Sequence, residues 1–252
     1  MYTGFSLNNI SFDEYNVTKN WDALFSGHKQ KTYLYLYKYI TQDGIINGDK
    51  IQEDWFPEIK ADIFISHSHD DADSALHLAR LLYDRFNLVS FIDSFVWGYA
   101  NDLLREIDNK YCKTNKDLYD YNKRNYSTSH VHMMLMTALN KMIDKTECIF
   151  FLNTENSIVL NDIENSTLSP WIYGEIEITR TIQKKSPEET RECIKLAEGG
   201  KLYEEFGLKI RYPLNIAHLN QLDVNKFSQW YKCGRKGPYA LDELYRITEL
   251  IE

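Results

Sequence analysis

The pattern of apolar and polar positions becomes regular near residue 61 and predicts alternating strands and helices. Two short apolar runs, Ala61–Ser66 and Leu88–Asp93, are bounded by polar residues, as is typical of buried strands. Asp71–Phe86 lies between them and carries apolar residues at helical spacing on one face. A strand, a helix and a second strand in this order indicate a βαβ unit, and therefore a parallel sheet.

The same alternation continues towards the C-terminus. Val131–Ile143 predicts a second amphipathic helix, and Glu147–Asn153 predicts a third strand. Ser169 and Pro170 are a favoured cap and first residue of a further helix, which should run to about Gln183. We therefore expect an α/β fold, a flavodoxin-like three-layer sandwich with a central parallel sheet. The remaining predicted elements are a helix from a capping box at Ser186–Glu189 to Gly199 and Gly200, a late strand at Lys209–Leu219 and a terminal helix at Leu241–Ile251.

Two stretches fall outside this alternation. Residues 1–58 are rich in aromatic side chains and turn signals, and we expect an N-terminal elaboration with a helix near Tyr33–Ile40. Residues 59–252 form the predicted main domain. Within it, residues 108–130 are polar and lack a clear period, which indicates an insertion or a long loop.

Composition narrows the class of protein. The formal net charge of −8 disfavours nonspecific binding to nucleic acid, which depends on basic side chains that neutralise phosphates. No apolar run approaches the ~18 residues of a membrane span, and the first residues do not form a signal peptide. We expect a cytoplasmic protein that binds neither nucleic acid nor membrane. The cysteines lie far apart and are expected to be free thiols: Cys112, Cys148, Cys193 and Cys233.

Polar and aromatic residues follow each predicted strand. In an open parallel sheet, ligands bind beyond the carboxyl ends of the strands. The first strand leads into Ser66 and His67, and the second leads into Asp93 and a segment that contains Trp97. These residues should therefore gather at one edge of the sheet, together with the helix that follows the third strand.

That helix carries a tryptophan and a carboxylate on one face. Trp171 and Glu175 are four residues apart, so they share a helix face. A carboxylate beside a large indole is partly desolvated, which raises its pKa. Gly174 in a helix interior costs about 1 kcal/mol relative to alanine, so its presence indicates a close contact with backbone or ligand.

Three of these segments together resemble the Toll/interleukin-1 receptor (TIR) domain family. Asp62–Asp71 resembles the first sequence box of TIR domains, and Phe91–Asp93 resembles the end of their second strand. Ser94–Ala100 then stands where TIR domains have a mobile loop. Ser169–Glu175 is similar to the tryptophan–glutamate helix of the enzymatic members. The resemblance covers residues 60–250, and its strength comes from three boxes in the right order.

The resemblance implies cleavage of NAD between nicotinamide and ribose, with NAD as substrate and no separate cofactor. Glu175 would be the catalytic carboxylate. Loss of neutral nicotinamide leaves an oxocarbenium-like ribosyl cation, which a nearby carboxylate stabilises. Trp171 would shape the pocket, Trp97 or Tyr99 could stack on nicotinamide or adenine, and Ser66, His67 and Asp93 would line the site.

As a whole, the sequence is similar to the TIR subunits of Thoeris anti-phage systems. That resemblance implies a messenger derived from ADP-ribose, often cyclic, which activates a separate effector protein. It also implies self-assembly through the TIR domain. The chain departs from the family where some members have arginines in the first loop, because it has His67 and His69 there. Residues 1–58 and 108–130 are also extra.

Each candidate residue also has a structural interpretation. Asp93 could be a turn or capping carboxylate, and Ser66 and His67 could be ordinary polar groups at a strand end. Trp97 could anchor a loop, Trp171 could set a helix angle, and Glu175 alone could be a surface residue.

Three other functions remain open. His67, His69 and Asp71 have the spacing that opens a metallo-β-lactamase-like zinc motif, although Ala72 stands where its next histidine would be. A TIR domain can also act as a non-enzymatic adaptor, against which the presence of Trp171 and Glu175 argues. Finally, an NAD-cleaving protein can act by NAD depletion alone.

Overall fold

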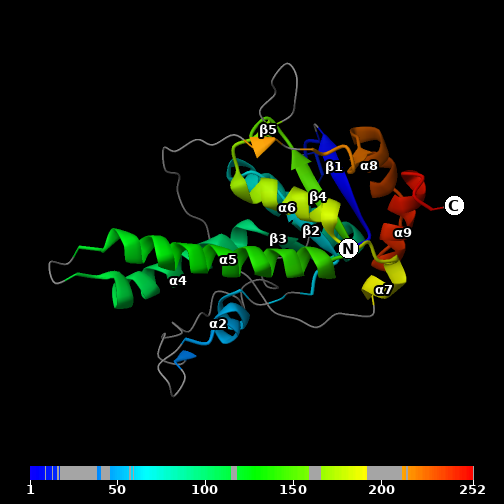
Figure 1. Ribbon diagram of the computed structural model, residues 1–252. Coiled ribbons are helices and arrows are strands. Elements are labelled where there is room, and N and C mark those ends of the chain that lie inside the picture. The colour runs from blue at the N-terminus through cyan, green and yellow to red at the C-terminus, as the bar shows by residue number, and fades with distance from the viewer. Residues whose placement is uncertain are drawn as a thin grey trace.

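A five-stranded parallel sheet forms the centre of the fold, and helices cover both of its faces (Figure 1). The computed structural model describes residues 1–8, 10–12, 14–15, 17, 39–40, 46–56, 58, 60–114, 118–158, 166–191, 212–213 and 215–251, with backbone only at 95–99 and 212–213. The strand order is β3-β2-β4-β1-β7. The strands are β1 (Thr3–Asn8), β2 (Ile63–Ser66), β3 (Ser90–Ile92), β4 (Cys148–Asn153) and β7 (Asn220–Leu222).

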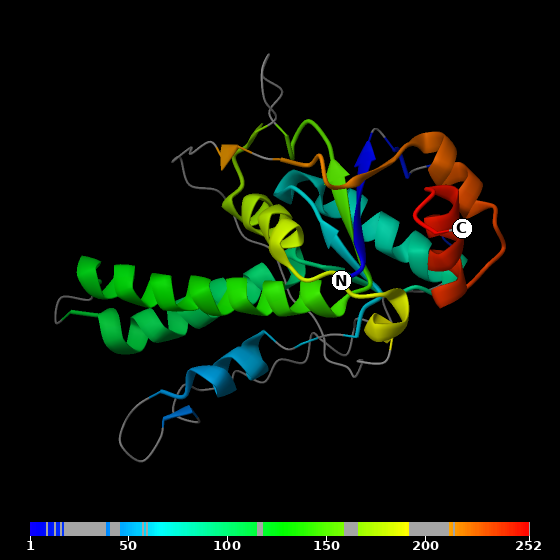
Figure 2. The same ribbon diagram turned by 45° about the vertical axis from the view of Figure 1, so that its right-hand side comes forward.

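Alternation along the strands sends side chains to two large cores and to a smaller cluster formed with Ile172 and Ile176. In β2, Ile63 and Ile65 face one core while Phe64 faces the other, as the period of two requires. The first core is covered by α3 (Ala72–Phe86), α8 (Val224–Tyr231) and α9 (Pro238–Ile247). The second is covered by α2 (Gly48–Trp55), α4 (Ser94–Ile107), α5 (Tyr121–Lys145) and α6 (Pro170–Thr181) (Figure 2). The prediction of a three-layer α/β sandwich is confirmed.

The N-terminal strand was not expected. β1 pairs along its whole length with β4 and on its other side with β7, and Phe5 is fully buried. In the flavodoxin-like order 2-1-3-4-5, β2, β3 and β4 take the places of strands 1, 2 and 3. β1 then lies where the fourth strand would be. The expectation that all of residues 1–58 are attached outside the sheet is therefore wrong for Thr3–Asn8, a strand too short for its apolar pattern to show.

A long helical hairpin replaces the predicted mobile loop and insertion. Ser94–Ala100 begins α4, which continues through a π-helical turn at Asp108–Cys112, and α5 begins at Tyr121 rather than near Val131. Asp120 caps α5 by accepting a hydrogen bond from the Lys123 backbone N–H at 3.0 Å. Both helices extend beyond the sheet side by side (Figures 1 and 2). The first turns of α5 have no sheet to pack on, so they lack the apolar stripe that would have revealed them.

The predicted late strand at Lys209–Leu219 lies partly outside the described residues and ends just before the strand that joins the main sheet. The strand that joins the main sheet is β7, whereas β6 (Tyr212–Pro213) pairs antiparallel with β5 (Ser166–Thr167) in a separate ribbon. The capping box at Ser186–Glu189 is confirmed: the backbone N–H of Ser186 donates to Glu189 at 2.7 Å. It begins α7 (Pro187–Arg191). The predicted end of this helix at Gly199 and Gly200, most of the predicted Tyr33–Ile40 helix, and Cys193 lie outside the described residues.

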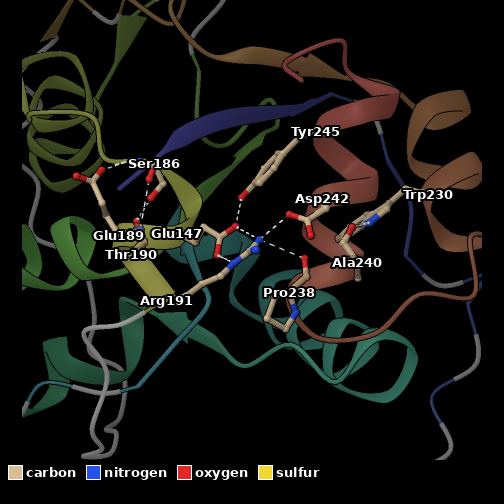
Figure 3. Close-up of polar contacts among 10 residues, drawn as sticks. All are labelled: Glu147, Ser186, Glu189, Thr190, Arg191, Trp230, Pro238, Ala240, Asp242 and Tyr245. Atoms are coloured by element: carbon tan, nitrogen blue, oxygen red, sulfur yellow. Dashed lines mark hydrogen bonds and ion pairs between the residues drawn. The ribbon is translucent and has the colours of Figure 1, made fainter. Parts of the chain in front are cut away.

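A polar cluster fastens three elements near the amino ends of the strands (Figure 3). Arg191 of α7 forms two hydrogen bonds with Glu147, at 2.8 and 2.9 Å, just before β4. It also bonds Asp242 of α9 at 2.7 Å. Tyr245 of α9 donates to the same Glu147 at 2.9 Å. Glu147 is almost fully buried, and this cluster gives its carboxylate three donors.

Gly4→Ala tests whether β1 is an integral strand. A Cβ at this position would lie 2.5 Å from Leu219 Cδ2 and 2.9 Å from Ile149 Cγ2. Overpacking of this kind costs roughly 1–3 kcal/mol, so we expect the urea-derived free energy of unfolding to fall by about 1–2 kcal/mol. An unchanged or higher stability would show that β1 does not pack as described.

Two further findings concern the whole described chain. No helix among the described residues is long and apolar enough to cross a membrane. The cysteines at 112, 148 and 233 are free thiols, as predicted.

Candidate functional site

Three elements meet at the carboxyl edge of the sheet. Ser66 is the last residue of β2, Asp93 directly follows β3, and Glu175 lies in the second turn of α6. Ser169 caps α6 by accepting a hydrogen bond from the Ile172 backbone N–H at 3.3 Å, as predicted. The start of α6 is thereby fixed over the ends of β2 and β3.

The Glu175 carboxyl contacts both strand ends. The hydroxyl of Ser66 donates to Glu175 Oε2 at 2.7 Å. Asp93 acts on Glu175 at short range: its charge, and a hydrogen bond that the pair can form when one of the two carries a proton, both raise the pKa of Glu175. Glu175 Oε1 and Asp93 Oδ2 have no other hydrogen-bond donor among the described residues.

His67 and Ser94 hold the other side of Asp93. His67 Nδ1 forms an ion pair with Asp93 Oδ1 at 2.9 Å. The backbone N–H of Ser94 donates to the same oxygen at 2.7 Å, and the Ser94 hydroxyl lies 3.1 Å from His67 Nε2. A continuous polar chain therefore runs from Ser66 through Glu175, Asp93 and His67 to Ser94.

Burial makes this chain electrostatically unusual. Ser66, His67, Asp93 and Glu175 all have 0% of their surface exposed. Burial raises the pKa of Glu175 well above its ordinary value, and the neighbouring charge of Asp93 raises it further. Burial alone would lower the pKa of His67, but the attraction of Asp93 outweighs it and the net shift is upward. Both shifts favour the protonated form, which is the neutral carboxyl of Glu175 and the charged imidazole of His67.

The two tryptophans relate differently to the carboxyl. Trp171 is half-buried one turn before Glu175, and its ring packs edge-on against His132 of α5, with centroids 5.5 Å apart. Trp97 lies in the first turns of α4, and its side chain is outside the described residues. Gly174 has the close contact that was expected, but with a side chain rather than with backbone or ligand: a Cβ there would collide with Met136 Cε of α5.

A second junction at the same edge was missed from the sequence. Asp71, at the end of the turn after β2, accepts hydrogen bonds from Thr154 at 2.5 Å and Asn156 at 2.8 Å. The loop after β4 is thus tied to the loop after β2. Ser94 was also missed as a site residue, although its place directly after a strand-end carboxylate was a usable signal.

The zinc interpretation of the histidine motif has no support in the geometry. His67 is buried against Asp93 and Ser94, His69 is exposed, and Asp71 is bound to the loop after β4. Within the described part of the chain, no three His, Cys, Asp or Glu side chains are grouped as metal ligands.

Comparison with known proteins finds no relative: no family model, no curated protein and no solved structure matches the chain. A functional proposal therefore depends on the sequence boxes and on the site that they form.

Proposed function

We propose that the protein is a TIR-like enzyme that cleaves the bond between nicotinamide and ribose in NAD, with Glu175 as the catalytic carboxylate. The observation that supports this most strongly is the contact of Glu175 with both Ser66 and Asp93. The three sequence boxes that resemble TIR domains thus supply one connected set of side chains at the edge where ligands of parallel sheets bind.

Cleavage of NAD requires one carboxylate in a site that contains little solvent. The pyridinium of NAD is a good leaving group, so its departure needs no general acid. The developing ribosyl cation is stabilised by an ionised Glu175, and this attraction is stronger in a site that excludes water. Ser66 orients the carboxylate through its hydrogen bond. Trp171 borders the site, and His67 and Asp93 complete its polar wall.

The described conformation is a closed one. Glu175 has no exposed surface, so NAD reaches it only after the packing around it opens. Enzyme sites that close over their chemistry use such motions to exclude water. Opening also has to let Glu175 release its proton to solvent before the residue can act as a carboxylate.

The product and its role extend the proposal. We expect a cyclic ADP-ribose derivative that serves as a messenger to a separate effector in anti-phage defence. Self-assembly through the TIR-like domain would complete the site. NAD depletion without a messenger and a non-enzymatic adaptor are the alternatives, and product analysis separates all three.

The test is to incubate the purified full chain with NAD, alone and in extract from phage-infected cells. Chromatography and mass spectrometry then identify the products. Free nicotinamide with a compound of the mass of ADP-ribose less water supports the messenger. Free nicotinamide with ADP-ribose supports depletion. Intact NAD in both conditions leaves the adaptor as the better account.

A further inference from the structure

The two carboxyl groups in the site are not equivalent. Oδ1 of Asp93 pairs with His67 and accepts a hydrogen bond from the backbone N–H of Ser94. Glu175 receives one donor, the Ser66 hydroxyl, and burial raises its pKa well above the ordinary value. These contacts point to Glu175 as the residue that carries the single proton of the pair.

We propose that Asp93, anchored by His67, is a positioning residue that holds the proton on Glu175 in the closed site and so decides when Glu175 becomes the reactive carboxylate. The inference rests on the proposed function, since it concerns the same glutamate. It assigns to Asp93 control of the protonation state of Glu175, which differs from a direct contact with NAD.

The groups that face this pair come from each element around it. β2 contributes Ser66 and, just beyond its end, His67. The start of α4 contributes Asp93 and Ser94, and α6 contributes Glu175 itself. Asp71 acts on His67 through its charge. His67 is the one basic group among these described neighbours, and it bonds to Asp93, so nothing in the set draws the proton away from Glu175.

The pH dependence follows from the direction of the shift. The folded pKa of Glu175 lies above its unfolded value, so the folded state binds more protons in the interval between the two. Its contribution to stability is therefore present at low pH and falls as pH rises through that interval. His67, with a raised pKa, changes stability in the same direction. Activity should rise over the same range, because Glu175 must ionise to react.

The first experiment reads the carboxyl groups directly. Carboxyl-carbon NMR of the full chain, labelled in its Asp and Glu side chains, is recorded from mildly acidic to alkaline pH. We expect one carboxyl to stay protonated at neutral pH, to be absent in Glu175→Gln, and in Asp93→Asn to titrate about 1–3 pH units lower. Asp108→Asn is the matched control. Asp108 is also buried but bonds Ser127 and Arg124 in the hairpin, so this variant should leave the titration unchanged.

A second readout needs neither assigned spectra nor a foldable Asp93 variant. The urea-derived free energy of unfolding of the unaltered protein should fall more steeply from neutral to alkaline pH than that of Glu175→Gln, which keeps the His67–Asp93 pair. Equal slopes would overturn the inference, as would a fully ionised set of carboxyls at neutral pH. If Asp93→Asn folds, the acid limb of its nicotinamide-release profile should shift to lower pH, mainly in kcat.

The two proposals fail separately. A shared proton in a protein that never releases nicotinamide would refute NAD cleavage and leave the carboxyl pair standing. Nicotinamide release that depends on Glu175, without a protonated carboxyl at neutral pH, would refute the role of Asp93 alone.

Discussion

Glu175→Gln is expected to reduce nicotinamide release from NAD at least about a hundredfold, the scale of losing one electrostatic contact to a transition state. Glutamine keeps the size of the side chain, and its amide oxygen can still accept the hydrogen bond from Ser66. It has no negative charge to stabilise a ribosyl cation. Nicotinamide is quantified by chromatography under conditions in which the unaltered protein is active.

The matched control is Glu177, which lies two residues further along the same helix. Glu177 is partly exposed and pairs with Arg180 at 2.8 Å, away from the buried carboxyl pair. Glu177→Gln makes the same substitution at a second site on α6 and should keep nearly full activity. If both variants lose activity equally, the effect comes from the net charge or stability of α6, and the special role of Glu175 is refuted.

Arg191→Ala is expected to cause the largest loss of stability among the single substitutions considered, about 2–3 kcal/mol in the urea-derived free energy of unfolding. Removing one partner of a buried ion pair costs about 3–5 kcal/mol, because the other charge stays buried and unpaired. We take a smaller value because the Arg191 side chain is 26% exposed. Glu147 would keep the Tyr245 hydroxyl but lose both guanidinium bonds (Figure 3).

Arg105→Ala is the comparison for this prediction. Arg105 pairs with Asp102 within α4, and both side chains are largely exposed. Ion pairs in this setting contribute little, so the unfolding midpoint should hardly move. A loss for Arg191→Ala as small as that for Arg105→Ala would mean that the Glu147 cluster does not fasten α7 and α9 to the sheet.

The sequence predicted which residues form the candidate site better than it predicted the contacts between them. Strand-end position brought Ser66, His67 and Asp93 to one edge, and the cap at Ser169 placed Glu175 there as well. The sequence did not show which of these residues touch. Trp171 was expected to desolvate Glu175, yet the named polar partners of that carboxyl are Ser66 and Asp93. Contacts between elements depend on helix angles, which local patterns do not encode.

The fold was predictable where a helix or strand packs along its whole length. α3 carries a continuous apolar stripe and was found, whereas the outer half of α5 projects past the sheet and shows none. β1 has only six residues, and its partners β4 and β7 lie far along the chain. Such a pairing is non-local, so neither propensity nor periodicity within residues 1–58 could indicate it.

The most direct measurement of the central claim is the time course of nicotinamide release from NAD by the unaltered protein beside Glu175→Gln, in buffer and in extract of phage-infected cells. The account predicts release by the unaltered protein in at least one of these conditions, with an equal amount of an ADP-ribose-derived product, and almost none by the variant. No release in either condition, or equal release by both proteins, would contradict it.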